Sequence, residues 1–71
     1  MSYEDLLSQI YSELPHLKGA LSAPRVVYVR AQGKVYITFE SSVLVEEASF
    51  LRMERILRRI FPQKPLALRV V

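Results

Sequence analysis

Two alternating runs of apolar residues on either side of Gly33 constrain the fold more than any other feature of the sequence. The alternating residues are Val27, Val29, Val35, Ile37 and Phe39. A period of two is typical of half-buried strands, and directly opposed residues of an antiparallel pair share a face. A three-residue loop, Ala31–Gly33, would set Val29 opposite Val35 and give Gly33 the left-handed position that such loops need. Residues 25–40 therefore predict a β-hairpin whose core face carries the alternating residues.

Two helical patterns flank this hairpin. The first runs roughly over Tyr3–Leu14 and stops before Pro15, which disfavours helical geometry at the preceding residue. In the second, Ser41-Ser42 can cap a helix that ends near Phe61 and is followed by another proline. The apolar side chains that would share one face of this second helix are Val45, Phe50, Met53, Ile56, Leu57, Ile60 and Phe61.

A last strand is expected over residues 66–71, and it completes an αββαβ order of elements. Leu66, Leu68 and Val70 would point inward, and Ala67, Arg69 and Val71 outward. A strand–helix–strand crossover makes the third strand parallel to the second. We expect the third strand beside the first, in sheet order 2-1-3. The fold class is then α+β, with a three-stranded mixed sheet and two helices on one of its faces.

The composition excludes several classes of protein. The 71 residues include no cysteine and one histidine, so there is no disulfide framework, thiolate metal site or histidine cluster. Apolar runs of three or four residues are too short to cross a membrane, and the acidic start of the chain does not resemble a signal peptide. We expect one soluble, cytoplasmic domain over residues 1–71. Because the chain stops at Val71 within a strand, we also expect a piece of a longer protein.

No set of residues predicts catalysis, and the expectation is that this domain by itself is not an enzyme. His16 lies in a turn between Pro15 and Leu17 and is interpreted as an exposed loop histidine. Glu46 and Glu47 are adjacent, so on a helix they diverge by about 100° and suit the positive end of the helix dipole instead. Carboxylates spaced to hold two metals are absent, as is a phosphate-binding glycine loop. We expect no cofactor, metal or small-molecule ligand.

The charge is unevenly distributed and points to a basic surface on the second helix. Residues 1–20 carry a net charge of −2, whereas residues 50–64 have five basic residues and one acid, a net charge of +4. Arg52, Arg55 and Arg59 share the helix face opposite the apolar one. Such a face can simply be solvated, or it can contact phosphates or an acidic protein. Leu51 beside these arginines favours a protein interface over a nucleic-acid one.

The face of the sheet without helices is the second candidate surface. In the predicted register it carries Val26, Tyr28, Tyr36, Thr38, Arg69 and Val71, with Tyr28 opposite Tyr36. A cross-strand tyrosine pair can merely stabilise a hairpin, or its rings can contact a protein or stack on bases. The glycine–aromatic signature of RNA-recognition modules and the GxxG loop of KH domains are both missing. Those absences favour a protein partner for Tyr28, Tyr36 and Arg69.

Three segments and the order of elements resemble a known family. The segments are VVYVRAQGKVYITF at 26–39, FLRMERIL at 50–57 and LALRVV at 66–71. They are similar to the N-terminal, non-catalytic domain of PolC-type DNA polymerase III alpha subunits. In that family a leucine-bearing helix precedes a hairpin, a long amphipathic helix and a final strand, in a KH-like arrangement. The family also resembles the C-terminal domain of the clamp loader's tau subunit.

The resemblance implies a docking domain for DNA replication. The parent would be a DNA-directed DNA polymerase, a nucleotidyltransferase with a 3′–5′ exonuclease, and no catalytic residue of that family belongs to this region. The expected partners are replication proteins or other domains of the parent, with weak nucleic-acid binding in addition. Two alternatives stay open. One is a KH-like module that binds nucleic acid directly, and the other is a small standalone subunit that dimerises through the edge at Val70-Val71.

Overall fold

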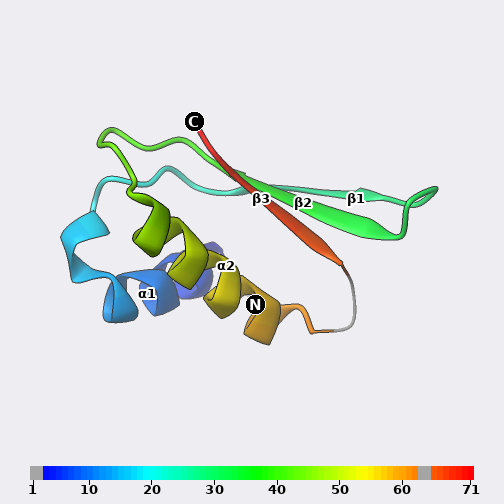
Figure 1. Cartoon of the computed structure of the whole chain (residues 1–71), viewed down its shortest axis with the longest axis horizontal. Helices are drawn as coiled ribbons and strands as arrows, with labels where there is room; N and C mark the ends of the chain where they lie inside the picture. Colours follow the sequence, from blue (N-terminus) through cyan, green and yellow to red (C-terminus); the bar gives the residue numbers. More distant parts are fainter. Residues whose placement is uncertain (1–2, 63–64) are drawn as a thin grey trace.

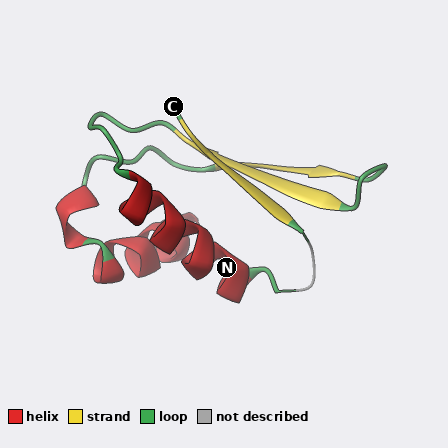
Figure 2. Ribbon diagram, viewed as in Figure 1, coloured by secondary structure: helices red, strands yellow, loops and turns green. Residues whose placement is uncertain are grey.

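The computed structural model describes residues 3–62 and 65–71, and it confirms the predicted order of elements (Figures 1 and 2). The elements are α1 (Tyr3–Glu13), η1 (Pro15–Leu17), β1 (Arg25–Val29), β2 (Lys34–Phe39), α2 (Glu47–Ile60) and β3 (Leu66–Val70). The short 3-10 helix η1 forms the turn that the sequence predicted around His16. Of the basic stretch at residues 50–64, Lys64 falls outside the described residues.

The chain forms two layers, with both helices on the same face of a three-stranded mixed sheet (Figure 1). β1 pairs with β2 antiparallel, and β2 pairs with β3 parallel. Figure 2 shows that the hairpin extends past the helices, and that no described element covers the other face of the sheet. The predicted α+β class and the one-sided helix layer are therefore confirmed.

The predicted strand order 2-1-3 is wrong, because the observed order is β1-β2-β3. Placing β3 next to β2 sets Leu66 beside Val35 and Leu68 beside Ile37, and all four side chains are buried on the helix side. A position beside β1 would have paired β3 with a strand that is mostly exposed. Burial of apolar surface therefore favours a position for β3 beside β2, the strand that precedes α2 in the chain.

The predicted hairpin register is also wrong, by one residue. Val29 pairs with Lys34 and Val27 with Tyr36, so a four-residue loop over residues 30–33 replaces the expected three-residue one. Gly33 does adopt the expected left-handed conformation, with a φ of 60°. Because one step in register moves every side chain of β1 to the other face, Val27 is 47% exposed whereas Val26 packs against the core.

The start of α2 is the third correction, because the helix begins at Glu47 and not after Ser41-Ser42. The backbone of these serines extends the sheet instead. The Ser41 N–H donates to the Val71 carbonyl at 2.8 Å, and the Ser42 N–H donates to the Ala20 carbonyl at 2.9 Å. The Ser41 hydroxyl accepts a 3.2 Å bond from the Val43 N–H, which closes a local turn rather than a helix cap.

The core lies between the sheet and the two helices. Its buried residues are Leu6, Ile10, Leu14, Leu17, Leu21, Val35, Ile37, Phe39, Met53, Ile56, Leu57, Leu66 and Leu68. The apolar face predicted for the second helix and the inward residues of β3 belong to this cluster or pack against it. Val27 and Val29 do not, as the register shift requires.

Candidate interaction surfaces

The six residues that the sequence singled out occupy three separate places. Tyr36 and Arg69 lie on the open face of the sheet, since their pairing partners there are Val27, Ala67 and Thr38. Tyr28 pairs with the buried Val35 and therefore lies on the opposite face. The predicted cross-strand pair of tyrosines is wrong for that reason. Arg52, Arg55 and Arg59 lie on α2.

The open face carries only cationic charge among its strand residues. Those residues are Arg25, Val27, Val29, Lys34, Tyr36, Thr38, Ala67 and Arg69. No aspartate or glutamate occurs within the three strands, and all three of their charged residues lie on this side of the sheet. The result is a small apolar strip with basic side chains around it.

Tyr36 stands at the centre of this face, on the middle strand. Its hydroxyl donates a 2.6 Å hydrogen bond to Oε1 of Gln32 in the hairpin loop. The Lys34 ammonium nitrogen lies 5.5 Å from the centre of the Tyr36 ring, within the range of a cation–π contact. These contacts hold the ring in place next to the exposed Val27. A fixed ring loses little conformational entropy on binding a partner.

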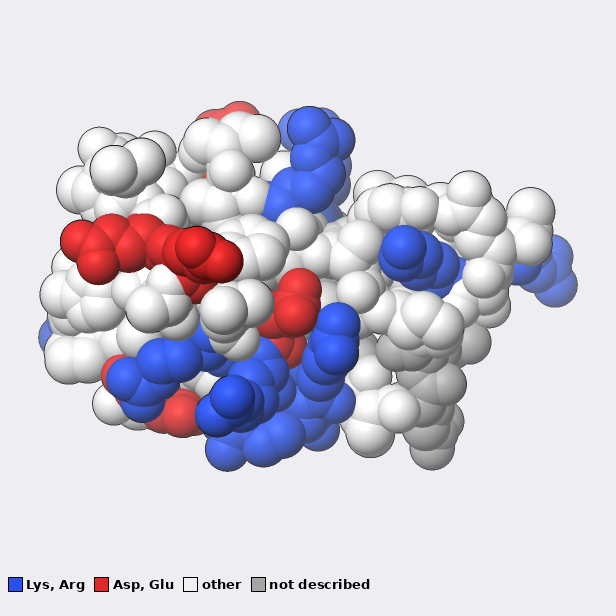
Figure 3. Space-filling view, in the orientation of Figure 1, with Lys and Arg blue, Asp and Glu red and all other residues white. Residues whose placement is uncertain are grey.

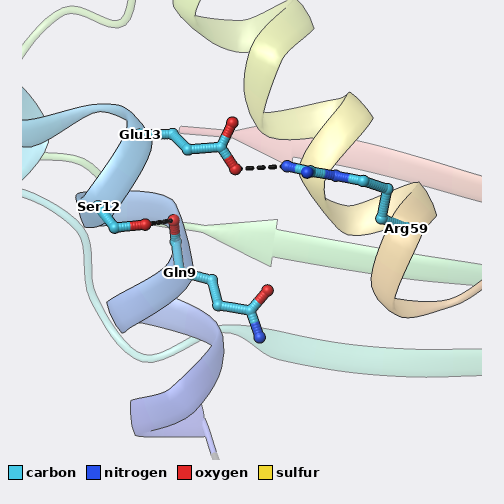
Figure 4. Close-up of polar contacts among 4 residues, drawn as sticks. All are labelled: Gln9, Ser12, Glu13 and Arg59. Carbon is cyan, nitrogen blue, oxygen red and sulfur yellow. Dashed lines mark hydrogen bonds and ion pairs between the residues drawn. The ribbon is translucent and has the colours of Figure 1, made fainter.

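The α2 arginines form a second basic surface, and they are exposed as predicted. Figure 3 shows lysine and arginine side chains gathered over the C-terminal half of α2. Arg59 forms an exposed ion pair with Glu13 of α1 (Figure 4), and Arg58 lies 3.4 Å from Glu54 one turn earlier. Within residues 3–62 and 65–71, Arg52 and Arg55 form no salt bridge.

One polar contact has no counterpart in the sequence analysis. His16 Nε2 lies 3.1 Å from the hydroxyl oxygen of Ser49, which is buried in α2. The two residues are 33 positions apart, so no local pattern could have shown the pair. No carboxylate in the described part of the chain pairs with His16. The contact joins η1 to α2, and it lacks the third group of a nucleophilic triad.

A third feature is an exposed apolar cluster where the sheet meets the start of α2. Val43, Leu44 and Val71 line a shallow groove there, and Leu44 is 91% exposed. The sequence predicted a helix from Ser41-Ser42 onward, so it did not predict this cluster, which precedes the observed start of α2 at Glu47. Glu46 and Glu47 follow directly, so this end of the molecule combines apolar and acidic side chains.

The described residues contain no group of three metal-ligating side chains, and no helix among them has the length and apolar character to cross a membrane. Comparison with protein families, with curated proteins and with solved structures gives no match. Function must therefore be inferred from the residues and their arrangement.

Proposed function

We propose that this chain is a non-catalytic docking domain of the bacterial replication machinery, comparable to the N-terminus of a PolC-type polymerase alpha subunit. The resemblance of residues 26–39, 50–57 and 66–71 to that domain supports the proposal. The αββαβ order of elements agrees with it. In this proposal the domain acts in the cytoplasm, and polymerase and exonuclease chemistry belong to the parent protein.

The single observation that carries a docking role is the uncovered face of the sheet. A purely solvated face would carry polar residues at most positions, whereas this one presents Val27, Val29, Tyr36 and Ala67. Arg25 and Arg69 lie on either side of Thr38, on the same face as Tyr36, and tyrosine and arginine are enriched where protein interfaces are strongest. Since the surrounding strand charges are all positive, the partner surface should be apolar with acidic side chains at its rim.

One observation favours a second candidate, direct binding of single-stranded nucleic acid. Tyr36 could stack on a base while Arg25, Lys34 and Arg69 contact phosphates. Neutralising about three phosphates predicts a slope of log affinity against log salt near −2. A protein interface with an apolar centre should show a shallower dependence on salt.

The test of the docking role is binding of the 71-residue chain to the remaining chain of a PolC-type alpha subunit. The Val27→Thr, Tyr36→Thr double variant keeps β propensity and removes apolar area from the open face. We expect it to fold and to bind at least about tenfold more weakly, which is about 1.4 kcal/mol. Surface plasmon resonance measures the affinity, and circular dichroism measures folding.

Tyr28→Thr is the matched control, because it removes the same kind of ring from the other face of the hairpin. Its binding should stay within about twofold of the wild-type affinity. Absence of saturable binding by the wild-type chain contradicts the proposal. Equal losses in the double variant and in Tyr28→Thr would contradict the role of the open face.

A further inference from the structure

The solvent side of α2 contains a shallow groove that is separate from the open face of the sheet. Its lining residues are Leu51, Glu54, Arg55, Arg58, Arg59 and Pro62. Leu51, Arg55 and Arg58 follow one another at helical spacing, so the groove runs along the helix for about two turns. Its chemistry therefore comes mainly from one continuous stripe of residues.

The groove has more positive charge than the described part of the chain neutralises. Four arginines, at positions 52, 55, 58 and 59, lie on or beside it. Glu54 pairs with Arg58, and Glu13 pairs with Arg59 across the two helices. That leaves the charges of Arg52 and Arg55 uncompensated. An anionic partner would supply the missing carboxylates or phosphates.

The apolar residues of the groove favour the carboxylates of a protein over the phosphates of a nucleic acid. Leu51 is 52% exposed at one end, and Pro62 is exposed at the other. A phosphate backbone offers a leucine no apolar contact, whereas protein interfaces combine an apolar centre with arginine. Glu54 in the lining would repel a phosphate, but a protein partner can place a polar or basic group beside it.

We propose that this groove binds an acidic amphipathic segment of a partner protein. An apolar side chain of that segment packs against Leu51, and its carboxylates accept hydrogen bonds from the guanidinium group of Arg55, which has no acidic partner among the described residues. A helix with apolar and acidic residues at i and i+4 presents both on one face, which fits a groove built along another helix. The site extends the proposed docking function to a second surface and does not depend on the open face.

The probe is an acetylated, amidated peptide of about 16 residues, with leucines and glutamates at i, i+4 spacing on one face. Fluorescence anisotropy measures its affinity for the 71-residue chain. We expect saturable binding that weakens when the glutamates become glutamine, and again when the leucines become serine. A peptide that binds equally well without its leucines would overturn the apolar part of the proposal.

Arg55→Glu should weaken peptide binding by at least about tenfold. Arg30→Glu makes the same charge change in the distant hairpin loop and should leave the affinity within about twofold. Arg55→Gln removes the charge without reversing it and should give an intermediate loss. Equal losses in Arg55→Glu and Arg30→Glu would mean general charge attraction and would overturn the assigned site.

Two further outcomes separate this inference from competing explanations. Tighter binding of a thymidine oligonucleotide than of the peptide, lost in Arg55→Glu, would overturn the proposal in favour of a nucleic-acid surface. Concentration-dependent self-association that Arg55→Glu abolishes would replace the partner by a second copy, whose Leu44 and Glu46 have the same chemistry. If the Val27→Thr, Tyr36→Thr double variant binds the polymerase chain weakly but binds the peptide normally, the groove on α2 is supported as a separate site.

Discussion

The two faces of the sheet differ both in residue type and in environment. On the helix side, β2 presents Val35, Ile37 and Phe39, and all three are buried. On the other side the same strand presents Lys34, Tyr36 and Thr38, which are partly exposed. The difference is imposed by the helices, because an apolar side chain gains stability only where another element removes it from water.

β1 shows how little the residue type alone decides. Val26 and Val27 are adjacent and chemically identical, yet one packs against the core and the other is exposed on the open face. Because β1 has valines at both even and odd positions, it can place a valine toward the core in either register. The apolar side chains of the open face are therefore exposed because no described element covers them, and they are accessible to a partner.

The first prediction tests the buried side and carries the largest expected effect. Leu57 is fully buried in α2, so Leu57→Ala should lower the free energy of unfolding by about 2–5 kcal/mol. That is a large fraction of the stability of a domain this small. Urea denaturation followed by circular dichroism measures it. Leu51→Ala, a deletion of the same size on the exposed side of α2, should cost less than about 0.5 kcal/mol.

The second prediction tests the register of the hairpin directly. Val26→Asp places a carboxylate at the edge of the core and should lower stability by about 1–3 kcal/mol. Val27→Asp places it on the open face, among Arg25 and Lys34, and should cost less than about 1 kcal/mol. Thermal unfolding of the two variants ranks them. The reverse ranking would restore the register in which Val27 faces the helices.

Some of the fold could be predicted from the sequence because its residue patterns had one solution. β3 alternates leucines with alanine and arginine, so its inward and outward residues were assigned correctly. The apolar stripe of α2 likewise identified Met53, Ile56 and Leu57 as core residues. In both elements only one face could be buried without placing a charge in the core.

The errors occurred where the sequence pattern allowed two solutions. Strand order depends on which neighbour completes the core for Leu66 and Leu68, and local periodicity does not contain that information. Ser41 is a good helix cap, but its backbone bonds to Val71, a residue far along the chain. The register error also changed which candidate residues share a face. Tyr36 and Arg69 share a face as expected, whereas Tyr28 lies on the other one.

The smallest predicted effect concerns the loop that sets this register. Gly33 has a φ of 60°, and a Cβ added there would meet no atom within 4 Å. Any loss of stability in Gly33→Ala therefore comes from the backbone conformation and not from steric crowding. We expect a loss of about 1 kcal/mol in the free energy of unfolding. Gly33→Asn should lose less, because asparagine tolerates the left-handed region better than alanine does. Both substitutions keep Tyr36 in place, so they should change thermal stability while binding through the open face stays within about twofold. A loss of binding larger than the loss of stability would show that the four-residue loop itself contacts the partner.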